Sequence, residues 1–201
     1  MSEPTPPTPS TARLESFSDG VFAVAATLLV LDLGLSGSGT LAHKLEHEWP
    51  YYATYVVSFL TIGIIWMNHH AQFERIAVAD RTLMVLNLFL LMFVTLIPFP
   101  TKLLANHLTG SEGSVAAAVY AATLLAMSIA FFCTYLWAAH RRLFGAWIAE
   151  QHVGYLLRRN VAGLFVYVVA IAVAFLNADV SLGLCGLVAL YYLHPGRKLE
   201  A

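Results

Sequence analysis

The chain has 201 residues, of which 59% are hydrophobic and only 11% are charged, and its mean hydropathy is +0.70. Soluble domains carry about 25% charged residues, so this chain lacks the charge needed to cover a water-facing surface. The high hydrophobic share excludes a disordered chain. The net charge of −1 excludes a nucleic-acid binder that works by bulk charge, and the presence of only two cysteines excludes a disulfide-rich scaffold. We therefore expect a protein embedded in lipid, with Cys133 and Cys185 packed as small hydrophobic residues.

The first ten residues, Met1 to Ser10, contain four prolines and no basic residue. This composition is typical of a flexible tail rather than of a secretory signal. The first predicted span follows at residues 11–35 and carries Glu15, Asp19 and Asp32 on it or at its ends. Because charged groups are costly in hydrocarbon, we expect this helix inside a bundle or along a water-filled path.

Five further apolar stretches are long enough for helices that cross a membrane, which need about 20 residues each. These spans are predicted at about residues 49–75, 81–105, 113–140, 158–177 and 179–195. The last two form a tight helical hairpin, and residues 197–201 remain as a short cytoplasmic tail. Because no internal repeat is visible, residues 11–196 are predicted to be one all-α, six-helix membrane domain.

The basic residues lie unevenly on the two sides of this topology. Lys44 and Lys102 fall on one side, and nine others fall on the opposite side: Arg13, Arg75, Arg81, Arg141, Arg142, Arg158, Arg159, Arg197 and Lys198. The positive-inside rule then predicts that both termini are cytoplasmic. The amphipathic stretch Leu143 to Leu157 is predicted to lie along the inner leaflet.

Polar residues within the first three spans lie at one depth. Asp19, His69 and Asn87 each lie six residues from the basic residue at the cytoplasmic end of their span, which is about 9 Å along a helix. We expect one hydrogen-bonded layer of six residues: Ser18, Asp19, Asn68, His69, His70 and Asn87. Arg13 lies about 240° around the helix from Asp19, so each is expected to pair with another helix.

Two roles for this layer remain open. It can simply hold the helices in register. It can also act as a gate or a pH-sensitive brace, because histidine titrates in the physiological range. In that case, protonation of His69 or His70 would weaken or reshape the layer.

An apolar stripe runs outward along the first helix. Four residues follow the i, i+3, i+4, i+7 rule: Val24, Thr27, Leu28 and Leu31. In a monomer this stripe would be a packing face. In a symmetric oligomer it would form a narrow hydrophobic constriction, with Asp19 and Asp32 as acidic rings near the two mouths.

The run Arg13 to Gly20, R-L-E-S-F-S-D-G, resembles the first-helix signature R-x-x-x-F-S-D-[GA] of the transmembrane protein 175 family. The segment Trp66 to His70 and the run from Asn87 to Pro100 are also similar to that family, so the resemblance covers about half of the chain. Members are potassium-permeable channels of lysosomes, bacteria and archaea. The resemblance implies the prokaryotic form, with six helices per subunit, a homotetramer and a location in the plasma membrane.

The resemblance also implies residue roles. Four copies of the first helix would line the pore, with Val24 at the main constriction and Thr27, Leu28 and Leu31 in further pore-facing layers. A structural hydrogen-bond brace would lie behind the pore: Arg13, Ser18, Asp19, His69, His70 and Asn87. The chain has no Thr-Val-Gly-Tyr-Gly filter, so potassium selectivity is expected to be modest. Its implied partners are potassium ions, the lipid bilayer and other copies of itself, with no cofactor, metal site or nucleic acid.

The alternatives to a channel are an intramembrane enzyme, an ion-coupled transporter and a purely structural scaffold, for which Asp19 has no obvious role. An intramembrane enzyme is disfavoured because His69 and His70 point about 100° apart and do not converge on one metal ion. His43 and His47 have i, i+4 spacing but read as a solvated outer loop. An ion-coupled transporter remains the alternative, because buried Asp and His also build proton relays, although no repeat or break in mid-membrane is visible.

Overall fold

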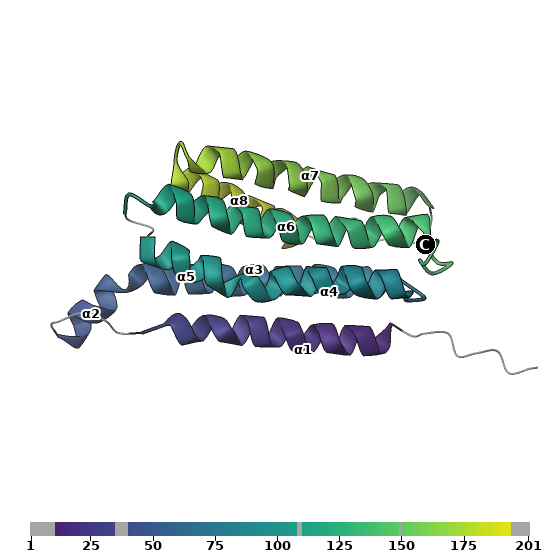
Figure 1. The fold of residues 1–201 in the computed structure, drawn as a ribbon, viewed down its shortest axis with the longest axis horizontal. Helices are drawn as coiled ribbons and strands as arrows, with labels where there is room; N and C mark the ends of the chain where they lie inside the picture. The colour runs from purple at the N-terminus through teal and green to yellow at the C-terminus, as the bar shows by residue number, and fades with distance from the viewer. Residues whose placement is uncertain (1–10, 35–39, 108–109, 149, 194–201) are drawn as a thin grey trace, which may run out of the picture.

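The computed structural model describes residues 11–34, 40–107, 110–148 and 150–193, and both predicted tails lie outside this part. The described chain is helical, and its long helices lie side by side in one bundle (Figure 1). The elements are α1 (Ala12–Leu28), the 3-10 segment η1 (Leu29–Asp32), α2 (Leu41–His47), α3 (Trp49–Phe73), α4 (Arg81–Leu96), α5 (Pro98–His107), α6 (Gly113–His140), α7 (Glu150–Ala174) and α8 (Ala178–Leu193).

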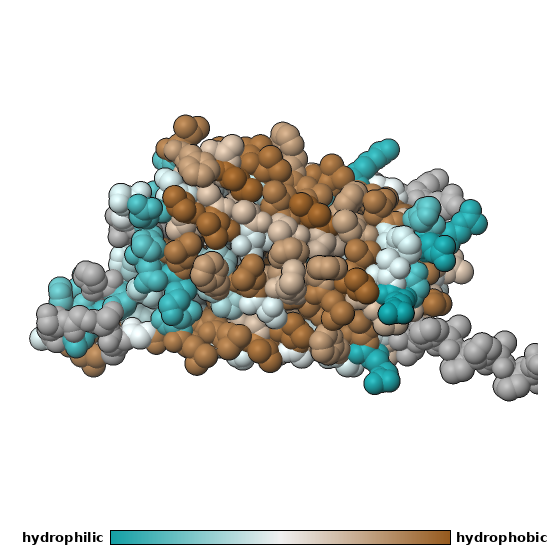
Figure 2. Space-filling view, viewed as in Figure 1, coloured by the Kyte–Doolittle hydropathy of each residue, from teal (hydrophilic) through white to brown (hydrophobic). Residues whose placement is uncertain are grey.

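Five helical segments of the described chain are long and apolar enough to cross a membrane: Ala12–Asp32, Trp49–Phe73, Arg81–His107, Gly113–His140 and His152–Ala174. The sixth predicted span, α8, has 16 residues and is therefore only about 24 Å long. On the face shown in Figure 2, hydrophobic residues form a broad band across the middle of the bundle, and hydrophilic residues gather toward both ends. The prediction of an all-α protein with several spans is confirmed.

The helices form three layers in Figure 1, with α1 at one edge, α3 to α5 in the middle and α6 to α8 on the far side. The central helix is α6, of whose span 56% is buried against 22% for the first span. Six buried alanines let its neighbours approach closely: Ala116, Ala117, Ala118, Ala121, Ala130 and Ala138. The helix with the polar signature is therefore the peripheral helix of the subunit.

The helices differ from the sequence prediction in three respects. The short helix α2 was not predicted. The third span is divided into α4 and α5 at Pro98, because proline cannot donate the helical hydrogen bond. The helix α7 begins at Glu150 rather than near residue 158.

The stretch Leu143 to Leu157 does not form one helix along the membrane surface, so that prediction is wrong. Its first part is a loop held against the loop that follows α3, through bonds from Ala77 N to Leu143 O and from Gly145 N to Arg75 O. Its second part is the beginning of α7. Leu156 is buried, and Leu143, Phe144 and Leu157 pack against the core, whereas Trp147 is 67% exposed.

Candidate functional site

A buried chain of hydrogen bonds joins the first three long helices. Asn87 of α4 donates from Nδ2 to Ser18 Oγ of α1 over 2.9 Å. Its Oδ1 lies 2.9 Å from His69 Nε2 of α3, and because an amide oxygen only accepts, His69 is the donor there. Each of these side chains is at most 1% exposed. We call these three residues the polar chain.

The polar chain is closed at both ends. Ser18 Oγ donates to Leu14 O over 2.8 Å within α1. At the other end the His69 ring lies between Phe22 and Phe73, with ring centroids 5.3 Å and 4.5 Å away. This environment holds α1 to α3 and α4 through specific bonds, and it leaves the imidazole surrounded by aromatic rings.

The other members of the predicted layer lie elsewhere, so the prediction of a single six-residue layer is wrong. Asp19 is exposed and accepts a 2.8 Å hydrogen bond from Trp66 Nε1. His70 is half exposed and lies 3.3 Å from Glu74. Asn68 donates to Tyr192 O of α8 over 3.1 Å.

Arg13 is exposed and pairs with no residue that the structure describes. The reason for these differences is angular. Consecutive helical residues point about 100° apart, so Ser18 and Asp19, like His69 and His70, share a depth but not a side. The depth predicted from the sequence places the polar chain correctly, whereas the direction of each side chain depends on packing.

The predicted stripe on α1 is not covered by the subunit. Val24 is 55% exposed, Leu28 40% and Leu31 75%. The opposite face of the same helix is buried, with Phe22, Ala25 and Leu29 at most 3% exposed. Thr27 is also exposed and donates its hydroxyl to Val24 O over 2.9 Å.

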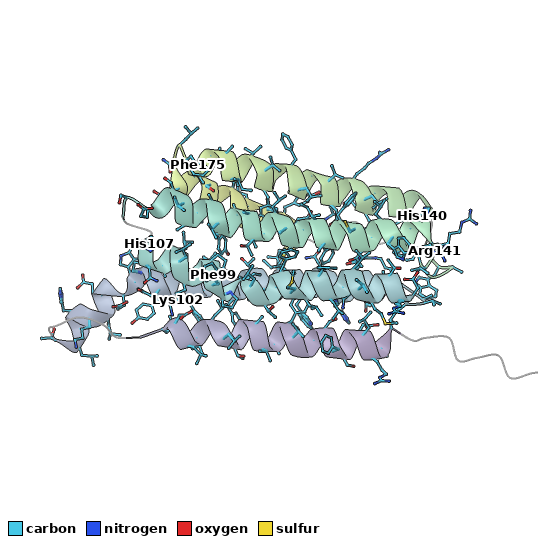
Figure 3. All side chains as sticks on the ribbon, in the orientation of Figure 1. Phe99, Lys102, His107, His140, Arg141 and Phe175 are labelled. Carbon is cyan, nitrogen blue, oxygen red and sulfur yellow. The ribbon has the colours of Figure 1, made fainter. Side chains whose placement is uncertain are left out.

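Asp32 makes an ion pair that the sequence did not suggest. Its Oδ1 lies 2.8 Å from Lys102 Nζ, which joins η1 to α5. Figure 3 shows Lys102 near the end of the bundle opposite His140 and Arg141. Asp32, the residue expected to form an acidic ring at this mouth, is therefore paired with a lysine. The one available signal was that Lys102 is one of only two basic residues assigned to the outer side.

No group of three or more His, Cys, Asp or Glu side chains could hold a metal ion within the described residues. The side chain of His47 lies outside that part, so the possible pairing of His43 with His47 is not described. Trp66 was also missed as a partner of Asp19, although it lies within the similar segment Trp66 to His70.

Comparison with known proteins identifies the fold. Residues 13–98 match the family described as the endosomal/lysosomal potassium channel TMEM175. A potassium channel of Streptomyces collinus is 45% identical over 186 residues, which cover 90% of each chain. A potassium channel of Chamaesiphon minutus is 38% identical over 188 residues, covering 90% of this chain and 93% of the relative.

A solved structure agrees with these matches. The crystal structure of a lysosomal potassium-selective channel TMEM175 homolog from Chamaesiphon minutus superposes with a TM-score of 0.82 and 37% identity. The match covers 90% of this chain and 95% of that one. The resemblance noted in the signature of the first helix is therefore confirmed: the chain belongs to the TMEM175 family and is similar to its bacterial potassium channels.

Proposed function

We propose that this protein is a potassium-preferring cation channel of a prokaryotic cell membrane, in which α1 of four subunits surrounds the pore. Its bacterial relatives are named potassium channels. The observation that carries the proposal is the stripe of Val24, Leu28 and Leu31, which the subunit itself leaves exposed. Four copies brought together around an axis would cover these side chains and form an apolar constriction.

An apolar stripe could also face lipid, but polar groups at the edge between α1 and α3 argue against this. Asp19 is exposed there beside Trp66 of α3, and His70 and Glu74 have side chains that are 51% and 62% exposed. Charged groups facing hydrocarbon are costly, whereas groups facing a water-filled path or another subunit are not. This side of the subunit therefore fits an assembly better than it fits lipid.

Permeation through such a constriction depends on the cost of removing water from the ion. Val24, Leu28 and Leu31 offer no polar atoms, and a hydrophobic ring can gate by dewetting. Potassium holds its water less tightly than sodium, so it crosses an apolar ring more readily. Thr27 donates its proton to Val24 O, which leaves the lone pairs of Oγ1 free to face a cation. Selectivity is then modest, and no cofactor is required.

The polar chain acts as the brace of this channel. It holds α1 against α3 and α4 from the face opposite the stripe, so the diameter of the constriction depends on its bonds. Asp19 with Trp66, and Asp32 with Lys102, add further contacts at the two ends of the first span. Within the subunit, Arg13 and His70 take part in none of these contacts. As members of the brace, they would contact a neighbouring subunit.

Flux from liposomes tests this function. The purified protein is placed in potassium-loaded liposomes in a sodium bath, and dye-reported proton uptake is followed after a protonophore is added. We expect uptake with potassium inside and less with sodium inside. Val24→Ala and Leu28→Ala should lower the potassium preference, and unchanged selectivity in both would place the constriction elsewhere.

A transporter is separated from a channel by kinetics and by size. Channel flux rises with the ion gradient without saturating at low concentration, whereas the turnover of a transporter saturates. The mass of the reconstituted protein should correspond to four chains. Saturating flux, or a dimer that conducts, would contradict the proposal.

A further inference from the structure

A cavity of about 130 Å³ lies between α3, α6, α7 and α8. None of the described residues that line it belongs to α1, so it is separate from the apolar stripe and from the polar chain. Asn68 lines one wall, where it donates a hydrogen bond to Tyr192 O and so joins α3 to α8. The cavity has no part in the conduction path described above.

The lining changes from cationic to apolar along the bundle. Arg75, just after the end of α3, and His152 and Arg159, in the first half of α7, line the end that carries most basic residues. Ile65 and Met127 line it further in. Ile65 precedes Arg75 by ten residues, which is about 15 Å along a helix. The cavity therefore has a charged mouth near the membrane boundary and a mostly apolar interior, which Thr61 and Ser128 also line.

Within the described residues, no carboxylate balances the charge of Arg75 at the mouth. No described lining residue is Asp or Glu. Arg75 Nη1 donates to Ala71 O over 2.6 Å and to Tyr135 OH over 3.1 Å, and it pairs with no carboxylate of the described chain. These acceptors are neutral, so they position the guanidinium without neutralising it. A cation at a poorly hydrated site favours an anionic partner.

Two further observations define the mouth. His152 is 9% exposed, and its Nε2 has no hydrogen-bond partner among the described residues. Arg159 Nη2 lies 3.4 Å from both Tyr191 O and Tyr192 O, and its guanidinium lies over both rings. The Tyr192 hydroxyl donates to Arg159 O over 3.1 Å, so this wall is held in place.

We propose that this cavity binds an anionic phospholipid from the leaflet next to the arginine-rich end. The headgroup phosphate would lie between Arg75 and Arg159, because guanidinium groups bind phosphate through paired hydrogen bonds. The first carbons of one acyl chain would enter between Ile65 and Met127. A phospholipid matches both the positive charge at the mouth and the change from charged to apolar lining along the cavity. A free phosphate would leave the apolar interior unfilled.

Native mass spectrometry of the purified oligomer tests the site. The protein is titrated with dioleoyl phosphatidylglycerol or dioleoyl phosphatidylcholine, which have the same chains. We expect phosphatidylglycerol to bind about tenfold more tightly or better: both lipids carry the phosphate, but the choline ammonium of phosphatidylcholine would lie close to two arginines and offset its attraction to them. Arg75→Gln and Arg159→Gln should each remove most of this preference. The control Arg158→Gln removes the same charge from the exposed neighbouring position and should preserve it.

A second pair of variants changes the space and keeps every arginine. Ala71→Leu places three more carbons in the cavity lining and should weaken phosphatidylglycerol binding, whereas Ala53→Leu, exposed on the same helix, should not. If the arginine variants fail to fold, this pair still tests whether phosphatidylglycerol occupies the cavity.

Three results would overturn the proposal. The first is equal binding of the two lipids to the parent protein. The second is an equal loss in Arg158→Gln and Arg159→Gln, which would indicate attraction by surface charge alone. The third is displacement of phosphatidylglycerol by millimolar inorganic phosphate, together with no effect of Ala71→Leu, which would make this a site for a free oxyanion.

Discussion

Asn87 of α4 and Ser18 of α1 are 69 residues apart in the sequence, and their side chains form a 2.9 Å hydrogen bond in the fully buried interior. The same amide accepts from His69 of α3. The Asn87 side chain therefore forms hydrogen bonds with side chains of two other helices at once. The hydrogen bonding of the three side chains is thus interdependent. Removing any one leaves a buried polar atom without a partner, which is the more costly way to lose a hydrogen bond.

Ser18→Ala should destabilise the protein by about 1–3 kcal/mol, because it leaves the Asn87 amide unsatisfied in the interior. Ser16→Ala is the matched control. Ser16 also donates to the carbonyl four residues earlier, but it is exposed. Thermal unfolding in the same lipid should show a lower midpoint for Ser18→Ala only. Equal midpoints for the two variants would mean that the bond to Asn87 contributes nothing to stability.

His69→Ala should change the response of potassium flux to acid, and His70→Ala should change it little. A proton added to His69 would place a charge between Phe22 and Phe73, so acidification is expected to weaken the polar chain. His70 is half exposed beside Glu74, where a charge is tolerated. Flux measured from pH 5 to pH 8 decides this. If both variants respond to pH as the parent does, the brace is not the pH-sensitive element.

Lys102→Met should raise potassium conductance at low ionic strength and have little effect at high ionic strength. The substitution leaves Asp32 unpaired near the outer end of the first span, where its charge attracts cations until salt screens it. Stability should change little, because the lysine side chain is 58% exposed. Asp32→Asn should lower conductance under the same conditions. An effect independent of salt would exclude an electrostatic cause.

Asp80→Ala should lower stability by about 1–2 kcal/mol, because Asp80 caps the N-terminus of α4. Its Oδ1 accepts from Leu83 N over 2.7 Å, and its carboxylate also accepts from Trp137 Nε1 over 3.0 Å. Asp80→Asn keeps an acceptor for the cap and should recover part of the loss. Thermal unfolding of both variants provides the measurement, and no difference between them and the parent would show that the cap is dispensable.

The polar chain shows what a sequence can predict about this site. Its depth followed from counting residues from the basic boundary of each span, and this identified Ser18, His69 and Asn87 together. The count could not separate Ser18 from Asp19, or His69 from His70, because adjacent residues differ in direction and not in depth. Which of each pair faces inward is decided by how α1 packs on α3 and α4.

The pairing of Asp32 with Lys102 marks a second limit. The residues are 70 positions apart, and they meet because α5 brings Lys102 back to the end of η1. Long-range ion pairs of this kind have no local pattern. The cavity between α3, α6, α7 and α8 is similar, since no local pattern in the sequence places Arg75 beside Arg159.

The sequence by itself determined that this protein lies in a membrane, that its helices are several and apolar, and that its first helix carries the family signature. These properties depend on composition and on patterns within single helices. The cost of placing charge in lipid acts on each helix separately, so its effect is visible in the local sequence. The tertiary structure decided which side of each helix is buried, that α1 lies at the edge with its stripe uncovered, and which distant side chains meet. Those outcomes depend on packing between helices, whose side chains fit together only in three dimensions.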